Sequence, residues 1–261
     1  MDIAVLGLGE AGARISADLV AAGCTVLGWD PARRPEGIAN ADSDRNAVRG
    51  ADVVLSVNTA AVALNVALHV AGELGQDTLY ADLNTAAPQL KQELAEALPV
   101  QFVDVALIGV VPSLGLATPA LASGTGAERF AELFRPLGMP VEVVGSRPGD
   151  AAGLKLLRSV FMKGMAAAAI ESLEAAEAAG VEDRVHADIA AVIGEPLLER
   201  LLAGSRDHAA RRVDEMQAAA AYVEELGVEP RVASAAAAWL LQLGDLADLE
   251  PDQAVGLERS E

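Results

Sequence analysis

The chain begins with an apolar run that leads into a glycine-rich turn, Asp2-Ile3-Ala4-Val5-Leu6-Gly7-Leu8-Gly9-Glu10-Ala11-Gly12. A strand that enters Gly-x-Gly-x-x-Gly and continues as a helix is typical of a dinucleotide-binding βαβ unit. In that pattern Gly7 allows the tight turn, Gly9 lets backbone N–H groups approach a pyrophosphate, and Gly12 lets the helix pack closely on the strand. The start of the helix then offers unpaired N–H groups to the phosphates.

We therefore predict that a dinucleotide binds at this turn, in contact with Gly7, Leu8, Gly9, Glu10, Ala11 and Gly12. The alternative is a glycine-rich strand-to-helix turn that holds no ligand.

Asp30 ends a second apolar run, residues 25–29, which follows a helical pattern over residues 10–22 and a helix stop at Gly23. It comes 23 positions after Gly7, close to the spacing of about 20 residues at which an acid holds the adenosine ribose. A carboxylate there accepts hydrogen bonds from both ribose hydroxyls and repels a 2′-phosphate, which favours NAD. Arg33 and Arg34 lie close enough in sequence to keep NADP open as an alternative.

Apolar strands alternate with helical patterns through the first half of the chain. Further strands are predicted at residues 51–57, 78–83, 100–107, 118–123 and 141–144, and helices at residues 42–49, 60–74, 87–98 and 127–134. Such alternation is typical of a doubly wound, mostly parallel sheet with helices on both faces. Pro, Gly and Asp cluster at residues 145–150 and mark a boundary. We therefore expect an α/β Rossmann domain over residues 1–148.

The second half has a helical texture. One long helical pattern runs over residues 150–179 and ends at Gly180, and further helices are predicted at residues 182–192, 195–203, 207–226 and 230–246. We expect an all-α domain over residues 149–261, led by a long inter-domain helix.

Composition narrows the class of function. The formal charge of −19 argues against nucleic-acid binding, because that needs a cationic surface. No apolar stretch reaches the roughly 20 residues of a membrane span. Because the first predicted strand begins at residue 2, we expect no signal peptide. A single cysteine, Cys24, excludes an internal disulfide and fits the cytoplasm, where we expect the protein. The three histidines lack ligand spacing, so no metal site is predicted.

Small polar residues follow two of the predicted strands. Val57, Asn58 and Thr59 follow the third strand, and Asn84 follows the fourth. Because ligands of open α/β sheets bind at the carboxyl ends of the strands, these residues are candidates for contact with the nicotinamide ribose. Equally, both asparagines can turn the chain and cap helices. The pattern alone leaves the two interpretations open.

Lysine is rare, with three lysines against 16 arginines. Lys155 and Lys163 fall in the long helical pattern, where they and Ser159 lie within about 80° of one another and Arg158 flanks them. A lysine in an apolar pocket can lose its proton near neutral pH, which suits an acid/base that removes a hydroxyl proton while hydride leaves the same carbon. The alternative is a solvent-facing polar stripe.

These residues resemble the β-hydroxyacid dehydrogenase family, whose relatives include 6-phosphogluconate dehydrogenase and 3-hydroxyisobutyrate dehydrogenase. The similarity covers most of the chain and is carried by the glycine turn, Asp82-Leu83-Asn84-Thr85-Ala86-Ala87-Pro88, the strand end at Asp104, Gly153-Leu154-Lys155 and residues 171–180. The resemblance implies a Rossmann domain joined by a long helix to an all-helical domain through which a homodimer forms. It also implies NAD(P)-dependent oxidation of a hydroxy acid, with Lys155 as general acid/base.

Three departures fall where the family pattern holds the substrate. Ile108 stands in the stretch where the family has serine and glycines, Ser159 replaces an asparagine, and Asn84 replaces a serine. The carboxylate-recognising part of the site is therefore expected to be rebuilt. The pattern His208-x-x-Arg211-Arg212 resembles a branch of 6-phosphogluconate-dehydrogenase-like proteins and implies cationic substrate contacts from His208 and Arg212. A basic turn on a solvent-facing helix is the alternative.

We therefore predict an NAD-dependent dehydrogenase or reductase for a small hydroxy-acid-like substrate. Lys155 and Ser159 are the expected catalytic residues, and Arg158 and Lys163 are expected to contact the substrate. An imine reductase is the nearest rival, although typical imine reductases have Asp or Tyr where Lys155 stands. A non-enzymatic module that binds NAD(H) is the alternative of a different class.

Overall fold

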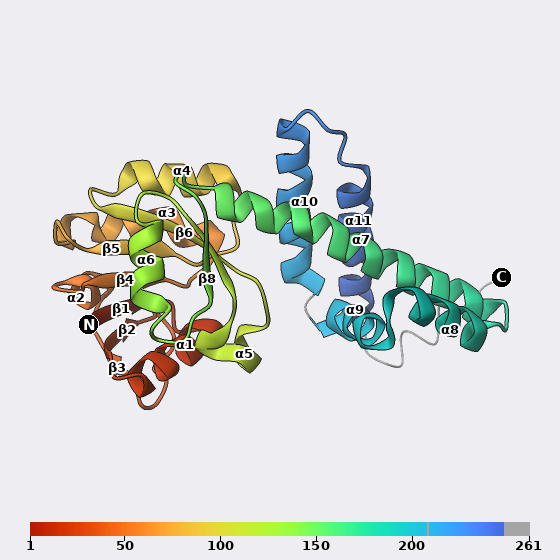
Figure 1. The fold of residues 1–261 in the computed structure, drawn as a ribbon, viewed down its shortest axis with the longest axis horizontal. Helices are drawn as coiled ribbons and strands as arrows, with labels where there is room; N and C mark the ends of the chain where they lie inside the picture. Colours follow the sequence, from red (N-terminus) through yellow and green to blue (C-terminus); the bar gives the residue numbers. More distant parts are fainter. Residues whose placement is uncertain (208, 248–261) are drawn as a thin grey trace. The chain divides into compact units, whose positions relative to one another are not determined.

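The computed structural model describes residues 1–207 and 209–247, which form two compact units. The first unit is Met1–Lys155, and the second begins at Leu156. One continuous helix, α7 (Asp150–Ala178), starts in the first unit and continues into the second. Its uninterrupted ribbon can be followed in Figure 1.

The first unit is built around one eight-stranded sheet with the order β3-β2-β1-β4-β5-β6-β7-β8. Its strands are β1 (Asp2–Leu6), β2 (Thr25–Trp29), β3 (Ala39–Asn40), β4 (Val53–Ser56), β5 (Leu79–Asp82), β6 (Gln101–Leu107), β7 (Ala120–Ser123) and β8 (Val141–Gly145). β6 and β7 pair antiparallel, and the other neighbours pair parallel. Because β1 lies between β2 and β4, the direction of strand order reverses beside it, which is where such sheets bind their ligands.

Helices cover both faces of this sheet (Figure 1). They are α1 (Glu10–Ala21), α2 (Asp44–Val48), α3 (Ala60–Val70), η1 (Ala71–Glu73), α4 (Pro88–Ala97), α5 (Val111–Leu114), η2 (Gly115–Ala117) and α6 (Ala127–Phe134). Successive residues of a strand point to opposite faces. Accordingly Ile3 and Val5 of β1 join the core under α1 and α6, while Ala4 and Leu6 join the core under α2, α3 and α4.

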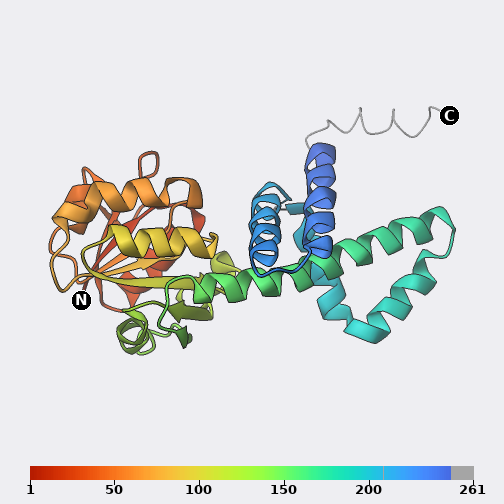
Figure 2. The ribbon, with the colours of Figure 1, turned by 90° about the horizontal axis from the view of Figure 1, so that it is seen from above.

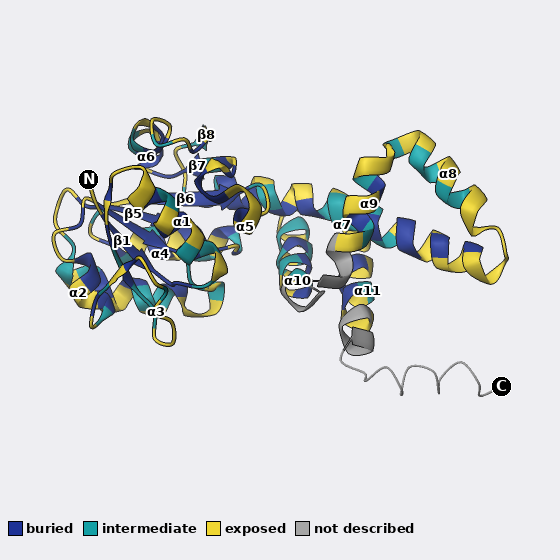
Figure 3. Cartoon of the chain, turned by 90° about the horizontal axis from the view of Figure 1, so that it is seen from below, coloured by how far each residue is buried: buried dark blue, intermediate teal, exposed yellow. Residues whose placement is uncertain are grey.

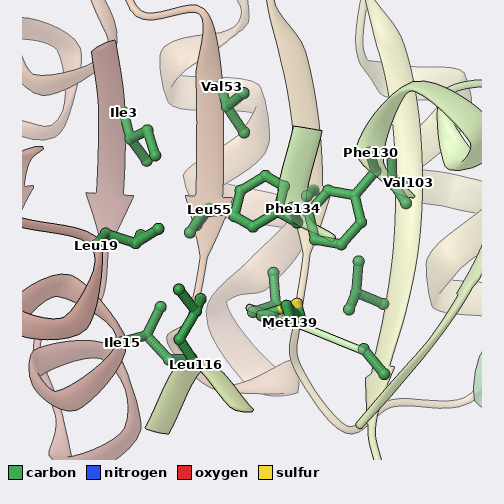
Figure 4. Packing of buried hydrophobic residues seen from close by; sticks show 14 of the residues in the cluster. Ile3, Ile15, Leu19, Val53, Leu55, Val103, Leu116, Phe130, Phe134 and Met139 are labelled. Atoms are coloured by element: carbon green, nitrogen blue, oxygen red, sulfur yellow. The ribbon is translucent and has the colours of Figure 1, made fainter. Parts of the chain in front are cut away.

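Both cores are closely filled. Figure 3 shows strands such as β1, β5 and β6 mostly buried beneath the helices, whereas β2, β3 and β8 are partly exposed. On one face Phe130 and Phe134 of α6 stack with ring centroids 4.2 Å apart and lie against the sheet near Leu55 and Val103 (Figure 4). Two buried faces explain why the strands are continuous apolar runs, since a half-exposed sheet would show alternation.

The second unit is helical throughout the residues that are described there. After α7 it contains α8 (Glu182–Ile193), α9 (Glu195–Asp207), α10 (Ala209–Glu225) and α11 (Arg231–Ala247). α10 and α11 lie side by side (Figure 2) and share a core of Leu156, Met216 and Leu240 with the small residues Ala219, Ala233, Ala236 and Ala237. Alanines at the contacts allow the helix axes to approach closely.

The predicted fold class is confirmed: a mostly parallel α/β sheet is followed by a helical region. Gly180 stops α7 as expected, with φ of 72° and with its N–H donated to the Glu177 carbonyl. The sequence patterns missed β3, α5 and η2, each too short to show a period. Within the described residues, no helix combines the length and the hydropathy needed to cross a membrane.

Candidate active site

The glycine turn leaves no room for a side chain at two of its three glycines. A Cβ on Gly12 would lie 1.9 Å from the Gly7 carbonyl oxygen, and a Cβ on Gly7 would lie 2.5 Å from the Val57 oxygen. Gly7 also has φ of 104°, which L side chains rarely adopt. At Gly9 the nearest group to a Cβ would be Arg33 Nη1, 3.8 Å away, so the backbone there is open to a ligand.

The start of α1 fits a pyrophosphate. Gly9 occupies the N-cap position, and no side chain in the described part of the chain caps the helix. Glu10 is exposed, Ala11 is half-buried and Leu8 is buried beneath the turn. The N–H groups of the first helical turn therefore point toward a site where an anion can accept them. The residues present fit the dinucleotide that the sequence predicts.

Asp30 is fixed by the backbone at the end of β2. Its Oδ2 accepts the N–H of Leu8 at 2.9 Å, and its Oδ1 accepts the N–H groups of Ala32 at 2.9 Å and Arg33 at 3.0 Å. Burial alone would raise the pKa of this carboxyl, but these hydrogen bonds outweigh burial and hold the pKa below its usual value. Asp30 therefore stands ionised beside the glycine turn.

Asn58 and Asn84 meet at the carboxyl ends of β4 and β5. Asn84 Nδ2 donates to Asn58 Oδ1 at 3.0 Å, to Ser56 Oγ at 3.2 Å and to Asp82 Oδ2 at 2.6 Å. Neither asparagine caps a helix: Thr59, which is exposed, is the N-cap of α3, and Ala87 is the N-cap of α4. Because Val57 and Asn58 also border Gly7, the structure brings the predicted strand-end residues together with the glycine turn.

A buried row of polar side chains lies across the sheet at this edge. Ser56 of β4 is in register with Asp82 of β5, Asp82 with Asp104 of β6, and Asp104 with Ser123 of β7. All four are fully buried. Lys91 of α4, also fully buried, places its Nζ 2.5 Å from Asp82 Oδ1 and 3.2 Å from Asp104 Oδ1. Burial alone would lower the pKa of Lys91, but the two carboxylates outweigh it and raise that pKa above its usual value.

Lys155, the predicted acid/base, lies near the start of α7 and is half-buried. Its Nζ donates to Thr85 Oγ1 at 2.7 Å. Thr85 directly follows Asn84, so the ammonium of Lys155 stands at the same edge of the sheet as the two asparagines. Within the first unit, a series of hydrogen bonds and chain neighbours thus leads from Lys155 through Thr85 and the two asparagines to the glycine turn.

Ser159 and Lys163 meet a partner in the second unit that the sequence analysis did not assign. The buried Ser159 donates its hydroxyl to Glu215 Oε1 of α10, and Lys163 Nζ donates to the same oxygen at 3.0 Å and to Ser159 Oγ at 3.3 Å. The Lys163 and Glu215 side chains are 19% and 13% exposed. The predicted polar stripe of α7 therefore has two different partners. Lys155 is hydrogen-bonded to Thr85, and Ser159 and Lys163 are hydrogen-bonded to Glu215.

The remaining predicted substrate contacts are distributed over α7, α10 and a residue that is not described. Arg158 is exposed on α7, and Arg212 is half-buried on α10. His208 lies outside the described residues. Where the family pattern has serine and glycines, the exit of β6 carries the half-buried Ile108, whose N–H donates to the Pro119 carbonyl at 2.7 Å, and the exposed Val110. The exit of β6 therefore carries apolar side chains where the family pattern has polar and small residues.

Sequence patterns missed Lys91, Ser56, Ser123 and Glu215. One signal for Lys91 was present: it occupies the buried stripe Pro88, Lys91, Leu94 of α4, where an apolar residue is expected. A cation in such a stripe needs buried anions. The other residues depend on sheet register or on a helix contact 52 positions away in sequence, which no local pattern encodes.

A Rossmann-type sheet with an open glycine turn and an ionised acid after β2 defines a class, the nicotinamide-dinucleotide-binding oxidoreductases. Residues 2–138, just over half of the chain, match the family described as the NAD binding domain of 6-phosphogluconate dehydrogenase. The chain belongs to this β-hydroxyacid dehydrogenase-like family, and its cofactor is NAD(P). Residues 176–243 match a domain of unknown function, DUF1932.

Proteins from bacteria and an archaeon are similar over most of the chain. A conserved hypothetical protein from Sinorhizobium meliloti 1021 is 31% identical, covers 92% of this chain and 87% of its own, and has a TM-score of 0.75. The 3-hydroxyisobutyrate dehydrogenase of Mycobacterium tuberculosis, solved with L-serine, is 23% identical over 99% of both chains, with a TM-score of 0.81. An uncharacterized 28.5 kDa protein in the 7S RNA 5′ region of Methanothermus fervidus is 29% identical over 66% of this chain and 68% of its own.

The fold is also that of imine reductases. An imine reductase variant from Myxococcus stipitatus, solved with NAD⁺, is 21% identical, covers 94% of both chains and has a TM-score of 0.66. Identity at this level shows a shared fold, and the reaction has to be argued from the residues of the site.

Proposed function

We propose that the protein is an NAD-dependent dehydrogenase of a small hydroxy acid, with Lys155 as general acid/base. One observation carries the proposal: Lys155 Nζ is held by Thr85 at 2.7 Å, and Thr85 follows Asn84, which bonds Asn58 beside the glycine turn. An amine is thus fixed at the edge of the sheet where the class binds its cofactor.

Oxidation of an alcohol removes a hydride from carbon and a proton from oxygen. Bound NAD supplies the hydride acceptor. Lys155 in its neutral form takes the hydroxyl proton, and in the reverse direction its ammonium returns that proton to the carbonyl oxygen. Such proton transfer typically contributes about 10²- to 10⁴-fold to the rate. The contact with Thr85 limits the positions of a side chain that otherwise has four rotatable bonds, which favours proton transfer along one direction.

Ser159 and Lys163 are proposed to orient the substrate. Because Ser159 donates its proton to Glu215 and accepts one hydrogen bond from Lys163, one lone pair of its oxygen remains to accept a hydrogen bond from a hydroxyl of the substrate. Glu215 also balances the charge of Lys163 at 3.0 Å, so Lys163 is the weaker anion site of the two basic candidates on α7, and the exposed Arg158 is the stronger. We propose Arg212 as a further cationic contact.

NAD is proposed over NADP because of Asp30. Three backbone N–H groups keep this carboxyl ionised at the place of the adenosine ribose. Arg34 is occupied in part, since its Nη1 donates to the Asp30 and Arg33 carbonyls. We expect Asp30→Ser to improve NADP relative to NAD by about tenfold, the weight of one partly exposed charge–charge repulsion. Equal preference for both cofactors in the wild type would contradict this assignment.

Two other functions are separated by the same assays. The apolar exit of β6, Ile108 and Val110, is compatible with an uncharged substrate such as a cyclic imine, so an imine reductase is the second candidate. Reduction of a cyclic-imine panel with NADPH, in the absence of hydroxy-acid turnover, would select it. NADH binding without turnover of either panel would select a non-enzymatic module.

We also propose that the helical unit forms a homodimer. Its α7 and α11 expose large apolar side chains, among them Phe161 at 65% and Val232 at 54%. Exposed apolar surface of this kind is typical of protein interfaces. Analytical ultracentrifugation should show two chains for the wild type and one for Phe161→Glu; a monomeric wild type would contradict the proposal.

The decisive assay follows NADH formation with a panel of 2- and 3-hydroxy acids. Lys155→Met should lose about 100-fold or more of kcat, with the Kd for NADH unchanged. Arg184→Met on α8, which removes another cation from a surface ion pair with Asp188, is the matched control and should leave kcat unchanged. Turnover by Lys155→Met within a few-fold of the wild type would remove the lysine from its role.

A further inference from the structure

The buried polar row of the sheet has a feature that the proposed reaction does not use. Asp82 and Asp104 face each other in register on neighbouring strands, and both are fully buried. Strands of a sheet are about 4.8 Å apart, so two carboxylates at this spacing repel each other strongly unless a cation lies between them. Lys91 is that cation: its Nζ contacts both carboxylates and also donates to the Asp82 carbonyl at 3.0 Å.

Asp104 also holds the beginning of α7. Its Oδ2 accepts the Ala152 N–H at 2.8 Å and the Ser123 hydroxyl at 3.2 Å, while Ser123 Oγ accepts the Ala151 N–H at 3.0 Å. These two side chains satisfy backbone donors in the first turn of a helix. The Asp104 charge also interacts favourably with the helix dipole there. Lys155 is one turn further along the same helix.

Asp82 holds the other partner of the Lys155 contact. Its Oδ2 accepts Asn84 Nδ2 at 2.6 Å, and its Oδ1 accepts the Asn84 backbone N–H at 3.3 Å. Thr85 is the next residue in the chain and accepts the ammonium of Lys155. One ion cluster, Asp82–Lys91–Asp104, is therefore bonded on one side to the turn that carries Thr85 and on the other to the helix that carries Lys155.

We propose that Lys91 is a positioning residue: through Asp82 and Asp104 it sets the register between the Thr85 turn and the start of α7, and thereby places the ammonium of Lys155. The expected effect on kcat rests on the proposed function of Lys155. The expected effect on the start of α7 does not. Without Lys91 the carboxylates of Asp82 and Asp104 repel each other. The smallest rearrangement that reduces this repulsion moves one carboxylate together with the segment hydrogen-bonded to it, either the Thr85 turn or the start of α7.

Hydrogen exchange measured by mass spectrometry tests the structural step without any substrate. In Lys91→Met we expect amides near residues 150–156 to lose roughly tenfold or more of their protection, since more than one hydrogen bond is loosened. Thr78→Val is the matched control. Thr78 is buried at the other end of β5, where its Oγ1 donates to the Ala51 carbonyl at 2.9 Å. It should cost stability without selective loss of protection at the start of α7.

A double-mutant cycle in kcat tests the catalytic step. Lys91→Met and Thr85→Val should each lower kcat, up to about 100-fold for a misplaced acid/base, with the Kd for NADH unchanged. The double variant should lose no more than the stronger single variant, because both act on the position of one ammonium. A merely structural role would give additive losses and weaker NADH binding.

Each arm has an outcome that overturns the proposal. If Lys91→Met does not fold, Asp104→Asn and Ser123→Ala take its place, with the same loss of protection expected near residue 150. Unchanged protection in a folded variant would show that the cluster does not hold α7. Loss of protection together with additive losses of kcat in the double-mutant cycle would show that the ion cluster holds α7 without placing Lys155. A wild type inactive on every hydroxy acid would instead refute the proposed function and leave the exchange result standing.

Discussion

The two units of the molecule bury polar groups in different ways. In the α/β unit, Asp82, Lys91 and Asp104 are fully buried, and sheet register together with backbone N–H groups fixes each carboxylate. In the helical unit, Lys163 and Glu215 remain partly exposed and meet across two helices whose core is rich in alanine. A sheet places neighbouring side chains by its hydrogen-bond ladder, whereas helices place them only by packing.

This difference agrees with the different roles that we propose for the residues of the two units. The α/β unit fixes its polar groups by sheet register and backbone hydrogen bonds, which suits a preorganised cofactor site and the acid/base that we propose. The helical unit holds Ser159, Lys163 and Glu215 with fewer constraints, which agrees with the role in orienting the substrate that we propose for Ser159 and Lys163.

The largest expected effect is on the stability of Lys91→Met. Removing one partner of a buried ion cluster leaves uncompensated charge and typically costs about 3–5 kcal/mol. Because the pKa of Lys91 is raised, its stabilisation should be fully present below about pH 10.5 and should be lost as the pH rises through the pKa of the folded state. Urea unfolding of wild type and variant across this range measures both. A cost below about 1 kcal/mol would break the contrast between the units.

The glycine turn gives the next largest effect. A methyl group on Gly12 has no space, since it would lie 1.9 Å from the Gly7 oxygen. The turn must open to accept it, so Gly12→Ala should weaken NADH binding by about 100-fold, or about 2.7 kcal/mol. Fluorescence titration with NADH measures this, and Gly23→Ala, at a glycine whose added Cβ meets no atom within 4 Å, separates loss of space from loss of a glycine. Equal losses for both variants would contradict the argument.

The fold could be predicted from the sequence more completely than the contacts within the site. Burial of the strands on both faces produces continuous apolar runs, and the glycine turn has a fixed spacing. Both patterns are local in the sequence, so the sheet, the turn from Gly7 to Gly12 and Asp30 could be predicted. Asn58 and Asn84 could be named singly, but their hydrogen bond to each other depends on the pairing of β4 with β5. The partner of Ser159 and Lys163, Glu215, lies on another helix, and only helix packing reveals it.

A smaller effect is expected at the ion pair of the helical unit. Lys163→Met should cost about 1 kcal/mol or less, because its contact with Glu215 is partly solvated. Urea unfolding of Lys163→Met and Lys91→Met compares the losses of unfolding free energy directly, because each variant replaces a lysine by methionine, one in each unit. A loss as large as that of Lys91→Met would mean that the helical cluster is as tightly held as the sheet cluster.

The smallest effect concerns Asp30 in acid. The pKa of this carboxyl is lowered in the folded state, so its stabilisation is present above about pH 3.8 and is lost as the pH falls through the lowered pKa. Asp30→Asn should therefore unfold with a shallower dependence on pH below about 4. Thermal melting of the two proteins in acid measures the slopes, and identical slopes would contradict the backbone contacts as the cause.

The central claim, that Lys155 moves the substrate proton, is tested most directly by chemical rescue. With a hydroxy acid that the wild type oxidises, Lys155→Ala should lose about 100-fold or more of kcat, and methylamine or ethylamine should restore part of the activity in proportion to the neutral amine present. Activity of Lys155→Ala within a few-fold of the wild type, unaffected by amines, would contradict the account.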